Sequence, residues 1–153
     1  MKRLELMLPP PLVAGLAALI MWVLARQGPV LELAIPVRLS LAILMTLSGL
    51  AVALAGVVSF HRAETTVNPF MPEKSTALVS SGIYRFSRNP MYLGMLLVLL
   101  AWALWLTAPL ALVGPALFVI WITRFQIIPE ERALRARFGP EFDAYCRRVR
   151  RWI

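Results

Sequence analysis

Four long apolar runs, separated by short polar or proline-containing stretches, dominate the chain. They cover residues 8–25, 39–60, 91–106 and 110–128. The second run has 22 residues without a charge, which is enough for an α-helix to cross a hydrocarbon core of about 30 Å. The last two runs flank Thr107-Ala108-Pro109, which predicts a helical hairpin. The pattern predicts an all-α integral membrane protein with four transmembrane helices, the last two forming the hairpin.

Small residues are frequent in the second run. Gly49 and Gly56, with Ser48, Ala53 and Ala55 nearby, put small side chains on a helix face that another helix could approach closely. Small residues scattered in a lipid-facing helix explain the same pattern, so both interpretations stay open.

Two short helices are predicted after the last apolar run. Residues 129–138 begin with proline and two acids and end with two arginines, and Gly139 follows, in agreement with the dipole and capping preferences of helices. A second helix begins at Pro140. Its apolar residues recur at spacings of four, three and four, and arginines cover its other faces, as in a cytosolic helix resting on anionic headgroups.

Composition and charge agree with a membrane location. The chain is 59% hydrophobic with a mean hydropathy of +0.72, well above the range of a water-soluble domain. Four spans place 14 of the 16 Lys and Arg on one side and leave only Arg26 and Arg38 on the other. The positive-inside rule therefore predicts that both termini are cytoplasmic. The net charge of +8 indicates anionic lipid headgroups as partner in place of nucleic acid.

Metal chemistry finds no support in the sequence. His61 is the only histidine and Cys146 the only cysteine, so neither has the partners of a metal site. No disulfide within the chain is possible. We interpret His61 as a polar residue that marks the end of a span.

A polar segment, residues 78–94, lies between the second and third apolar runs. Gly82 permits a tight turn, Arg88 is a fixed positive charge, and Tyr84 and Tyr92 each carry a ring face with a hydroxyl at its edge. Such groups suit a charged, aromatic small molecule bound at the membrane surface. The alternative is a juxtamembrane loop whose arginines set the topology and whose tyrosines form an interfacial belt.

Two separate motifs decide between these alternatives by their order and spacing. They are Leu78-Val79-x-x-Gly82-x-Tyr84 with Arg88-Asn89-Pro90-x-Tyr92-x-Gly94, and Glu130-Glu131-x-x-Leu134 with Phe138-Gly139-x-x-Phe142-x-x-Tyr145. The chain from residue 68 to its end resembles the integral-membrane methyltransferases of the isoprenylcysteine carboxyl methyltransferase and phospholipid methyltransferase type. The resemblance implies one domain over 1–153, with an N-terminal helix pair (1–64) and a part (65–153) that holds the cofactor loop, the hairpin and the C-terminal helices.

The resemblance implies S-adenosylmethionine as the cofactor. Its ammonium suits Glu130, its adenine or sulfonium suits Tyr84 and Tyr92, and its carboxylate suits Arg88. In the family, the positions that contact the cofactor match Thr76, Ala77, Leu78, Val79, Tyr84, Asn89, Pro90, Met91, Tyr92 and Glu130.

The acceptor implied by the resemblance is lipophilic and membrane-resident, similar to an isoprenylcysteine carboxylate or a phospholipid amine. The sequence departs from the prenylcysteine enzymes at two positions. Asn89 replaces their usual histidine, and Gln126 replaces the arginine that they use for the substrate. Arg124 lies two residues earlier, roughly 200° around an α-helix. Arg124 and Gln126 are therefore candidates on the acceptor side, and Glu131 of the second motif is grouped with them as a catalytic candidate.

Two other functions remain alternatives at this point. One is a nicotinamide-dependent membrane reductase, because sterol-reductase-like proteins share a related C-terminal architecture. The other is a membrane adaptor that keeps the fold without catalysis. Methyl transfer agrees best with the sequence, since an in-line displacement needs positioning and exclusion of water more than acid–base residues.

Overall fold

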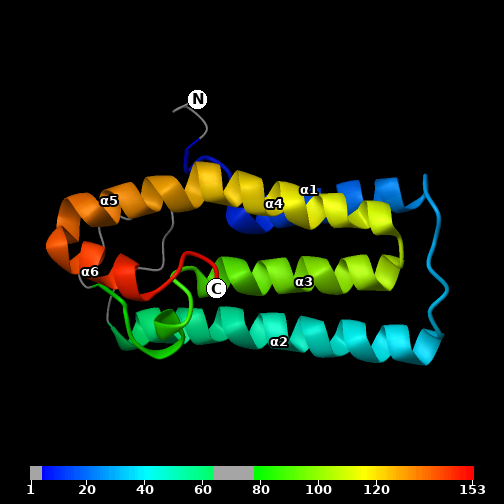
Figure 1. Cartoon of the computed structure of the whole chain (residues 1–153), viewed down its shortest axis with the longest axis horizontal. Helices are drawn as coiled ribbons and strands as arrows, with labels where there is room; N and C mark the ends of the chain where they lie inside the picture. Colours follow the sequence, from blue (N-terminus) through cyan, green and yellow to red (C-terminus); the bar gives the residue numbers. More distant parts are fainter. Residues whose placement is uncertain (1–4, 64–77) are drawn as a thin grey trace.

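The computed structural model of the 153-residue chain describes residues 5–63 and 78–153. All regular structure in these two ranges is helical, which confirms the all-α prediction (Figure 1). The elements in chain order are α1 (Pro10–Ala25), α2 (Ile35–Arg62), η3 (Gly82–Arg85), α3 (Pro90–Leu106), η4 (Pro109–Leu112), α4 (Val113–Ile122), η5 (Thr123–Ile127), α5 (Ile128–Phe138) and α6 (Pro140–Arg148).

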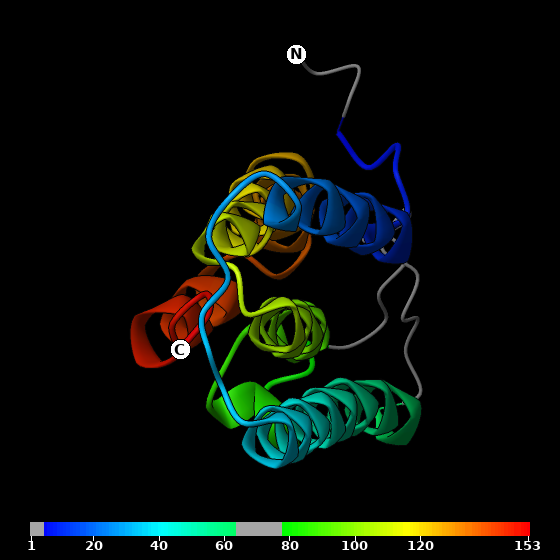
Figure 2. The same cartoon turned by 90° about the vertical axis from the view of Figure 1, so that its right-hand side faces the viewer.

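Helix α3 occupies the middle of the bundle. It packs along α2 on one side and against α1 and α4 on the other, and the end-on view in Figure 2 shows these three levels. Helices α5 and α6 lie at the end of the bundle where α3 begins, on the left of Figure 1. The opposite end carries the connection from α1 to α2.

Two helical stretches are long and apolar enough to cross a membrane. They are α2, with 28 residues, and the continuous helical segment Pro109–Phe138, with 30 residues. Helices α1 and α3 are apolar but shorter, with 16 and 17 residues. On α2, Leu44, Leu47 and Leu54 are each more than half exposed, as expected of side chains that face lipid.

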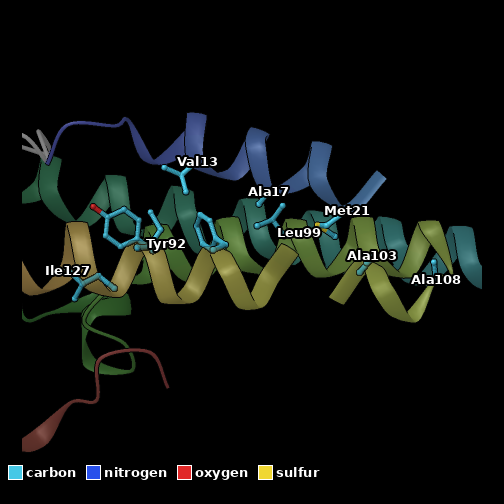
Figure 3. Close-up of a cluster of buried hydrophobic side chains, with 11 residues drawn as sticks. Val13, Ala17, Met21, Tyr92, Leu99, Ala103, Ala108 and Ile127 are labelled. Atoms are coloured by element: carbon cyan, nitrogen blue, oxygen red, sulfur yellow. The ribbon is translucent and has the colours of Figure 1, made fainter. Parts of the chain in front are cut away.

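The core lies between α1, α3 and α4. Met21, Phe118 and Ile122 are 0%, 1% and 0% exposed, and they pack with Leu99 of α3 in the cluster drawn in Figure 3. Gly114 touches Met21, and a Cβ at this position would collide with the methionine side chain. The small residue therefore sets the distance between α1 and α4.

Helices α2 and α3 approach each other closely at paired glycines. A Cβ on Gly94 would lie 2.5 Å from the Gly49 oxygen and 2.8 Å from the Ala53 Cβ, and a Cβ on Gly56 would lie 2.8 Å from Cγ of Met91. The interpretation of Gly49 and Gly56 as a close-approach face is confirmed, because side chains at these positions would force the helices apart.

Both predicted C-terminal helices form, but α6 ends at Arg148, so Phe138 lies in α5, and Val149 and Arg151 lie in the segment after α6. Gly139 adopts a φ of 49° and donates its N–H to the Arg135 oxygen at 2.9 Å, which ends α5 before α6 begins at Pro140. The apolar face of this region faces the protein, because Phe142, Tyr145 and Val149 pack against a cluster of neighbours that includes Leu78. The segment 78–94 is thereby joined to α6.

Candidate active site

The polar motifs meet at the end of the bundle where α3 begins. Pro90 starts α3 and is buried, and Asn89, which precedes it, is extended away from helical geometry with a φ of −132°. The chain therefore turns sharply between η3 and α3. This turn brings segment 82–92 against α5 and against the C-terminal tail, residues 149–152 (Figure 1).

Tyr92 and Glu130 form a buried pair between α3 and α5. The Tyr92 hydroxyl donates to Oε1 of Glu130 at 2.5 Å, and Tyr92 is 6% exposed. Glu130 lies in α5, beyond the apolar run 110–128. Burial raises the pKa of the Glu130 carboxyl to about 8; the Tyr92 hydrogen bond lowers it and repulsion from Glu131 adds to the rise. Glu130 therefore keeps its proton at neutral pH until a cation approaches.

Glu131 is in a different electrostatic environment. Its Oε1 accepts from Nη2 of Arg88 at 2.9 Å and from Nε of Arg151 at 3.0 Å, and its Oε2 accepts from Nη2 of Arg151 at 2.7 Å. The pair with Arg151 is thus bidentate. The side chains of Glu131 and Arg88 are each 13% exposed. Glu131 is thus paired with two guanidinium groups, and Nε of Arg88 is buried without a partner in the described part of the chain.

The C-terminal tail crosses the site and joins its parts. The Arg151 oxygen accepts from Nδ2 of Asn89 at 2.8 Å, and the Arg150 oxygen accepts from the N–H of Arg88 at 3.1 Å. Nε1 of Trp152 donates to Oγ1 of Thr123 at 3.2 Å. The tail therefore ties the motif segment to α5 and to η5.

Tyr84 is held by two contacts, one to its backbone carbonyl and one to its ring. Its carbonyl accepts from the Tyr145 hydroxyl at 2.8 Å, and its ring meets Phe60 edge to face with centroids 5.4 Å apart. Burial raises the pKa of both phenols, so both remain neutral. Val79 is buried nearby, at 7% exposure.

Arg124 and Gln126 lie in η5, a π-helical turn that continues α4 into α5. Nη1 of Arg124 lies 3.6 Å from Oε1 of Glu5. Gln126 is 1% exposed and donates from Nε2 to the Leu8 oxygen at 2.6 Å, while its Oε1 has no partner in the described residues. The contacts of these two candidates are thus with the N-terminal segment 5–8.

The structure brings most of the candidates together. Glu130, Glu131, Arg88, Asn89 and Tyr92 belong to one connected cluster. Thr76 and Ala77 lie outside the described residues. Within residues 5–63 and 78–153, Arg124 and Gln126 are not joined to the cluster by a side-chain hydrogen bond or ion pair, since they bind the segment 5–8. Among the other predicted positions, Leu78 packs with Phe142 and Tyr145, Met91 lies beside Gly56 of α2, and the buried residues are Val79, Tyr84 and Pro90.

Sequence reasoning missed Arg151, Trp152 and Glu5. Arg151 belongs to a basic stretch that favours headgroup binding, and nothing in its spacing distinguishes it from Arg150. Arg151 and Glu131 are 20 residues apart and meet only because the chain turns between α5 and α6. No local sequence pattern indicates such a pair. Glu5 binds Arg124 and also Arg132, at 3.1 Å, across more than a hundred residues.

Comparison with known proteins identifies the family. Residues 37–141, more than two thirds of the chain, match the family model described as phospholipid methyltransferase. The chain belongs to the phospholipid methyltransferase family. The matched region contains α2, the motif segment, α3 and the Glu130-Glu131 pair, so it includes most of the site described above.

Three known proteins are each similar to a part of this chain. An uncharacterized protein of Haemophilus influenzae is 49% identical over 63 residues, 41% of this chain and 100% of that protein. The probable protein-S-isoprenylcysteine O-methyltransferases of Oryza sativa subspecies indica and japonica are each 32% identical over 108 residues. These matches cover 70% of this chain and 56% of each rice protein, so the chain spans about half the length of the rice relatives. No solved structure matches the chain.

Proposed function

We propose that this protein transfers a methyl group from S-adenosylmethionine to a lipophilic acceptor resident in the membrane. The observation that carries the proposal is the Tyr92–Glu130 pair beside the Arg88–Glu131–Arg151 network, a polar cluster at the end of an apolar bundle. Membership of the phospholipid methyltransferase family supports the same chemistry and favours it over a nicotinamide-dependent reductase.

The residues of the cluster fit the charged groups of this cofactor. Glu130 is buried and protonated, and it would lose its proton to become the counter-charge of the ammonium. Nε of Arg88, buried without a partner in the described residues, is a donor available to the carboxylate. When bound, S-adenosylmethionine supplies an electrophilic methyl group on its sulfonium. The chain contributes alignment and exclusion of water more than acid–base chemistry. An amine acceptor would react in its unprotonated form, after releasing its proton to solvent.

Glu131 has a positioning role in this proposal. Both of its oxygens are occupied by guanidinium donors, so its charge orients Arg88 and anchors Arg151. Arg88 in turn would hold the cofactor. A carboxylate whose lone pairs are already used in this way is a poor nucleophile or base.

The acceptor side is assigned to the π-helical turn with Arg124 and Gln126. Such turns are frequent at functional sites. Gln126 is 1% exposed and uses its amide donor on the Leu8 oxygen, so it offers no charged contact to a carboxylate. This favours a phospholipid amine over a prenylcysteine carboxylate, although the rice relatives carry the isoprenylcysteine name.

The membrane topology proposed here has four spans, made by α1, α2, α3 and the apolar run 110–128, which ends where α5 begins. The cofactor segment, α5, α6 and both termini lie on the cytoplasmic side. Two points support this arrangement: the four apolar helices run side by side, and four spans would put 14 of the 16 Lys and Arg of the sequence on one side.

A methyl-transfer assay tests the proposal. Membranes that contain the protein are incubated with S-adenosylmethionine tritiated in the methyl group and with native lipid extract. We expect label in the organic phase for the wild type and for Glu141→Gln, an exposed acid of α6, and little label for Glu130→Gln. Chromatography of the labelled lipid identifies the acceptor atom. Cofactor binding without any labelled product would overturn the proposed transferase activity.

A further inference from the structure

An apolar groove lies between α2 and α3, away from the candidate active site. Its volume is about 420 Å³. Leu39, Ala42 and Leu47 of α2 and Val98, Ala101 and Trp105 of α3 are among its lining residues. Thr46 is the one lining residue with a side-chain hydroxyl. The groove belongs to the half of the bundle where α2 begins and α3 ends, on the right of Figure 1.

The groove runs from the first turns of α2 towards the middle of the bundle. Towards the middle of the bundle it stops where Gly49 and Gly94 bring the two helix backbones together. Ala101 and Ala42, 2% and 8% exposed, form its floor. From Leu47 to Leu39 it extends for eight residues, roughly 12 Å at 1.5 Å per residue, and ends one residue from Arg38.

Arg38 places a positive charge at the end of the groove where α2 begins. Its guanidinium carbon lies 4.4 Å from the centroid of the Trp105 ring, which lines the groove. Its Nε is buried without a hydrogen-bond partner, and no carboxylate of the described residues forms an ion pair with it. An arginine and a tryptophan stacked at the start of an apolar helix are typical of the membrane interface.

We propose that this groove is a binding site for one phospholipid, with an acyl chain between α2 and α3 and the phosphate on Arg38. The apolar walls exclude a polar occupant, and a space of this size between packed helices in a bilayer is filled by hydrocarbon. The planar guanidinium presents donors that match the oxygens of a phosphate. The apolar length and the charge at one end reproduce the arrangement of a phospholipid.

This site differs from the proposed acceptor site. Tyr92, which belongs to the candidate active site, packs in the core formed with α1 and α4 and does not line the groove. Of the groove residues of α3, Trp102 alone also packs against that core. The inference rests on the proposed insertion of α2 and α3 in a bilayer and is independent of methyl transfer. The bound lipid would be a resident of the leaflet opposite the one that borders the active site.

Arg26 provides a matched control for Arg38. It lies at the same end of the bundle and also stacks on a tryptophan, with its guanidinium carbon 3.7 Å from the Trp22 centroid. It does not adjoin the groove. Replacing each arginine by glutamine removes the same charge and a similar stacking contact at the same end of the bundle, so the pair isolates the contribution of the groove.

The experiment measures lipid binding to the detergent-purified full chain by native mass spectrometry. Wild type, Arg38→Gln and Arg26→Gln are titrated with phosphatidylglycerol and with the diacylglycerol of the same chains. We expect one phosphatidylglycerol per chain in the wild type and in Arg26→Gln. Loss of a charge-assisted hydrogen bond should weaken binding by about tenfold or more in Arg38→Gln. Diacylglycerol should bind all three proteins as weakly as Arg38→Gln binds phosphatidylglycerol.

A groove-filling variant, Ala42→Leu, tests the chain-binding part separately, and it should also weaken phosphatidylglycerol binding. Equal affinity of Arg38→Gln and Arg26→Gln would overturn the proposal. Displacement of the lipid by millimolar inorganic phosphate would show a simple anion site and would overturn it as well. A dimer that Ala42→Leu dissociates would mean that a second copy covers the groove. Calorimetry of S-adenosylmethionine binding to Arg38→Gln reports separately on the proposed function.

Discussion

Two adjacent glutamates in the first turn of α5 have different partners. Glu130 faces the buried Tyr92 hydroxyl and burial raises its pKa to about 8, whereas Glu131 accepts hydrogen bonds from Arg88 and Arg151. The preference of a helix N-terminus for acids applies to both and does not distinguish them. Because Glu130 pairs with a phenol hydroxyl and Glu131 with two guanidinium groups, we assign them different roles.

Glu130→Gln is expected to weaken S-adenosylmethionine binding by about 1.5–3 kcal/mol, the range of a hydrogen bond to a charged group. The amide oxygen can still accept from Tyr92, so the fold is retained while the counter-charge of the ammonium is lost. Isothermal titration calorimetry measures the change, with Glu141→Gln as the control for charge. Unchanged affinity in the folded variant would remove Glu130 from the site.

The raised pKa of Glu130 also predicts a pH dependence of stability. The native carboxyl holds its proton up to about pH 8, whereas an unfolded glutamate releases it near 4.5. Folding therefore takes up a proton between these values, and the stability from this group is greatest at low pH and is lost as the pH rises through 8. Thermal unfolding of the apo protein in detergent from pH 5 to 9 should show a steeper decline for wild type than for Glu130→Gln. Parallel curves would contradict the assigned pKa.

At the residue scale, the sequence predicts which residues gather but not how they pair. The spaced motifs indicate that Glu130, Tyr92 and Arg88 belong to one site, and the structure joins them. The burial of Gln126 against the Leu8 oxygen depends on a contact across 118 residues, and no local pattern contains it. Tertiary contacts of this kind need the positions of whole helices, which composition and spacing leave open.

At the element scale, the C-terminal tail is a structural part of the candidate site. Its backbone carbonyls accept hydrogen bonds from Arg88 and Asn89, and the Arg151 side chain forms an ion pair with Glu131. This gives a physical reason for an amide at position 89, because Nδ2 of an asparagine donates directly to the Arg151 oxygen. The basic tail was predicted to rest on headgroups, yet one of its arginines faces the protein.

Arg151→Ala should release the tail. The side chain of Arg151 is 35% exposed and Glu131 retains Arg88, so we expect a loss of about 1 kcal/mol of stability, near the upper range of partly exposed ion pairs. Hydrogen exchange measured by mass spectrometry should become faster in the peptide that contains the Arg88 amide. Arg150→Ala, which keeps the backbone acceptor and removes an exposed side chain, should exchange as wild type does. Equal exchange in both variants would contradict the role of Arg151.

The contact between α2 and α3 allows a second test at this scale. Gly94→Ala places a methyl group 2.5 Å from the Gly49 oxygen, so overpacking should cost about 1–3 kcal/mol of unfolding free energy. Gly15→Ala in α1 meets nothing within 4 Å and should stabilise the helix by roughly 0.5–1 kcal/mol. Thermal unfolding in detergent compares the two. A neutral Gly94→Ala would mean that the helices separate there at little cost.

Helix existence was easier to predict than helix detail. The apolar run 39–60 identifies α2, which the structure extends to Ile35–Arg62. The π-helical turn Thr123–Ile127 was not predicted, since nothing in its residues separates it from an α-helix. The Leu6 N–H donates to the Phe125 oxygen at 2.9 Å in this turn, so its backbone is satisfied in part by a distant segment. Only the folded chain brings that donor to the turn.

At the scale of the whole molecule, the arrangement concentrates polar chemistry at one end of the bundle. The motif segment, α5, α6 and the C-terminal tail meet where α3 begins, and the opposite end has Arg26 and Arg38 stacked on tryptophans. The sequence predicts the four helices and the asymmetry of charge. It does not predict that α3 lies between α2 and the α1–α4 pair, because all four helices are apolar on most of their surface.

Cysteine labelling tests the topology on which this arrangement depends. Cys146 is first replaced, and single cysteines are introduced at Ser81, Glu141 and Gln27, all of which are exposed. The positive-inside rule predicts that Ser81→Cys and Glu141→Cys react with a membrane-impermeant maleimide from the cytoplasmic face, and Gln27→Cys from the other face. Methyl transfer by each variant shows that the protein is folded. Labelling of positions 81 and 141 from opposite faces would separate the two motifs and leave no shared site, because Arg88 and Glu131 could not then form the ion pair that joins them.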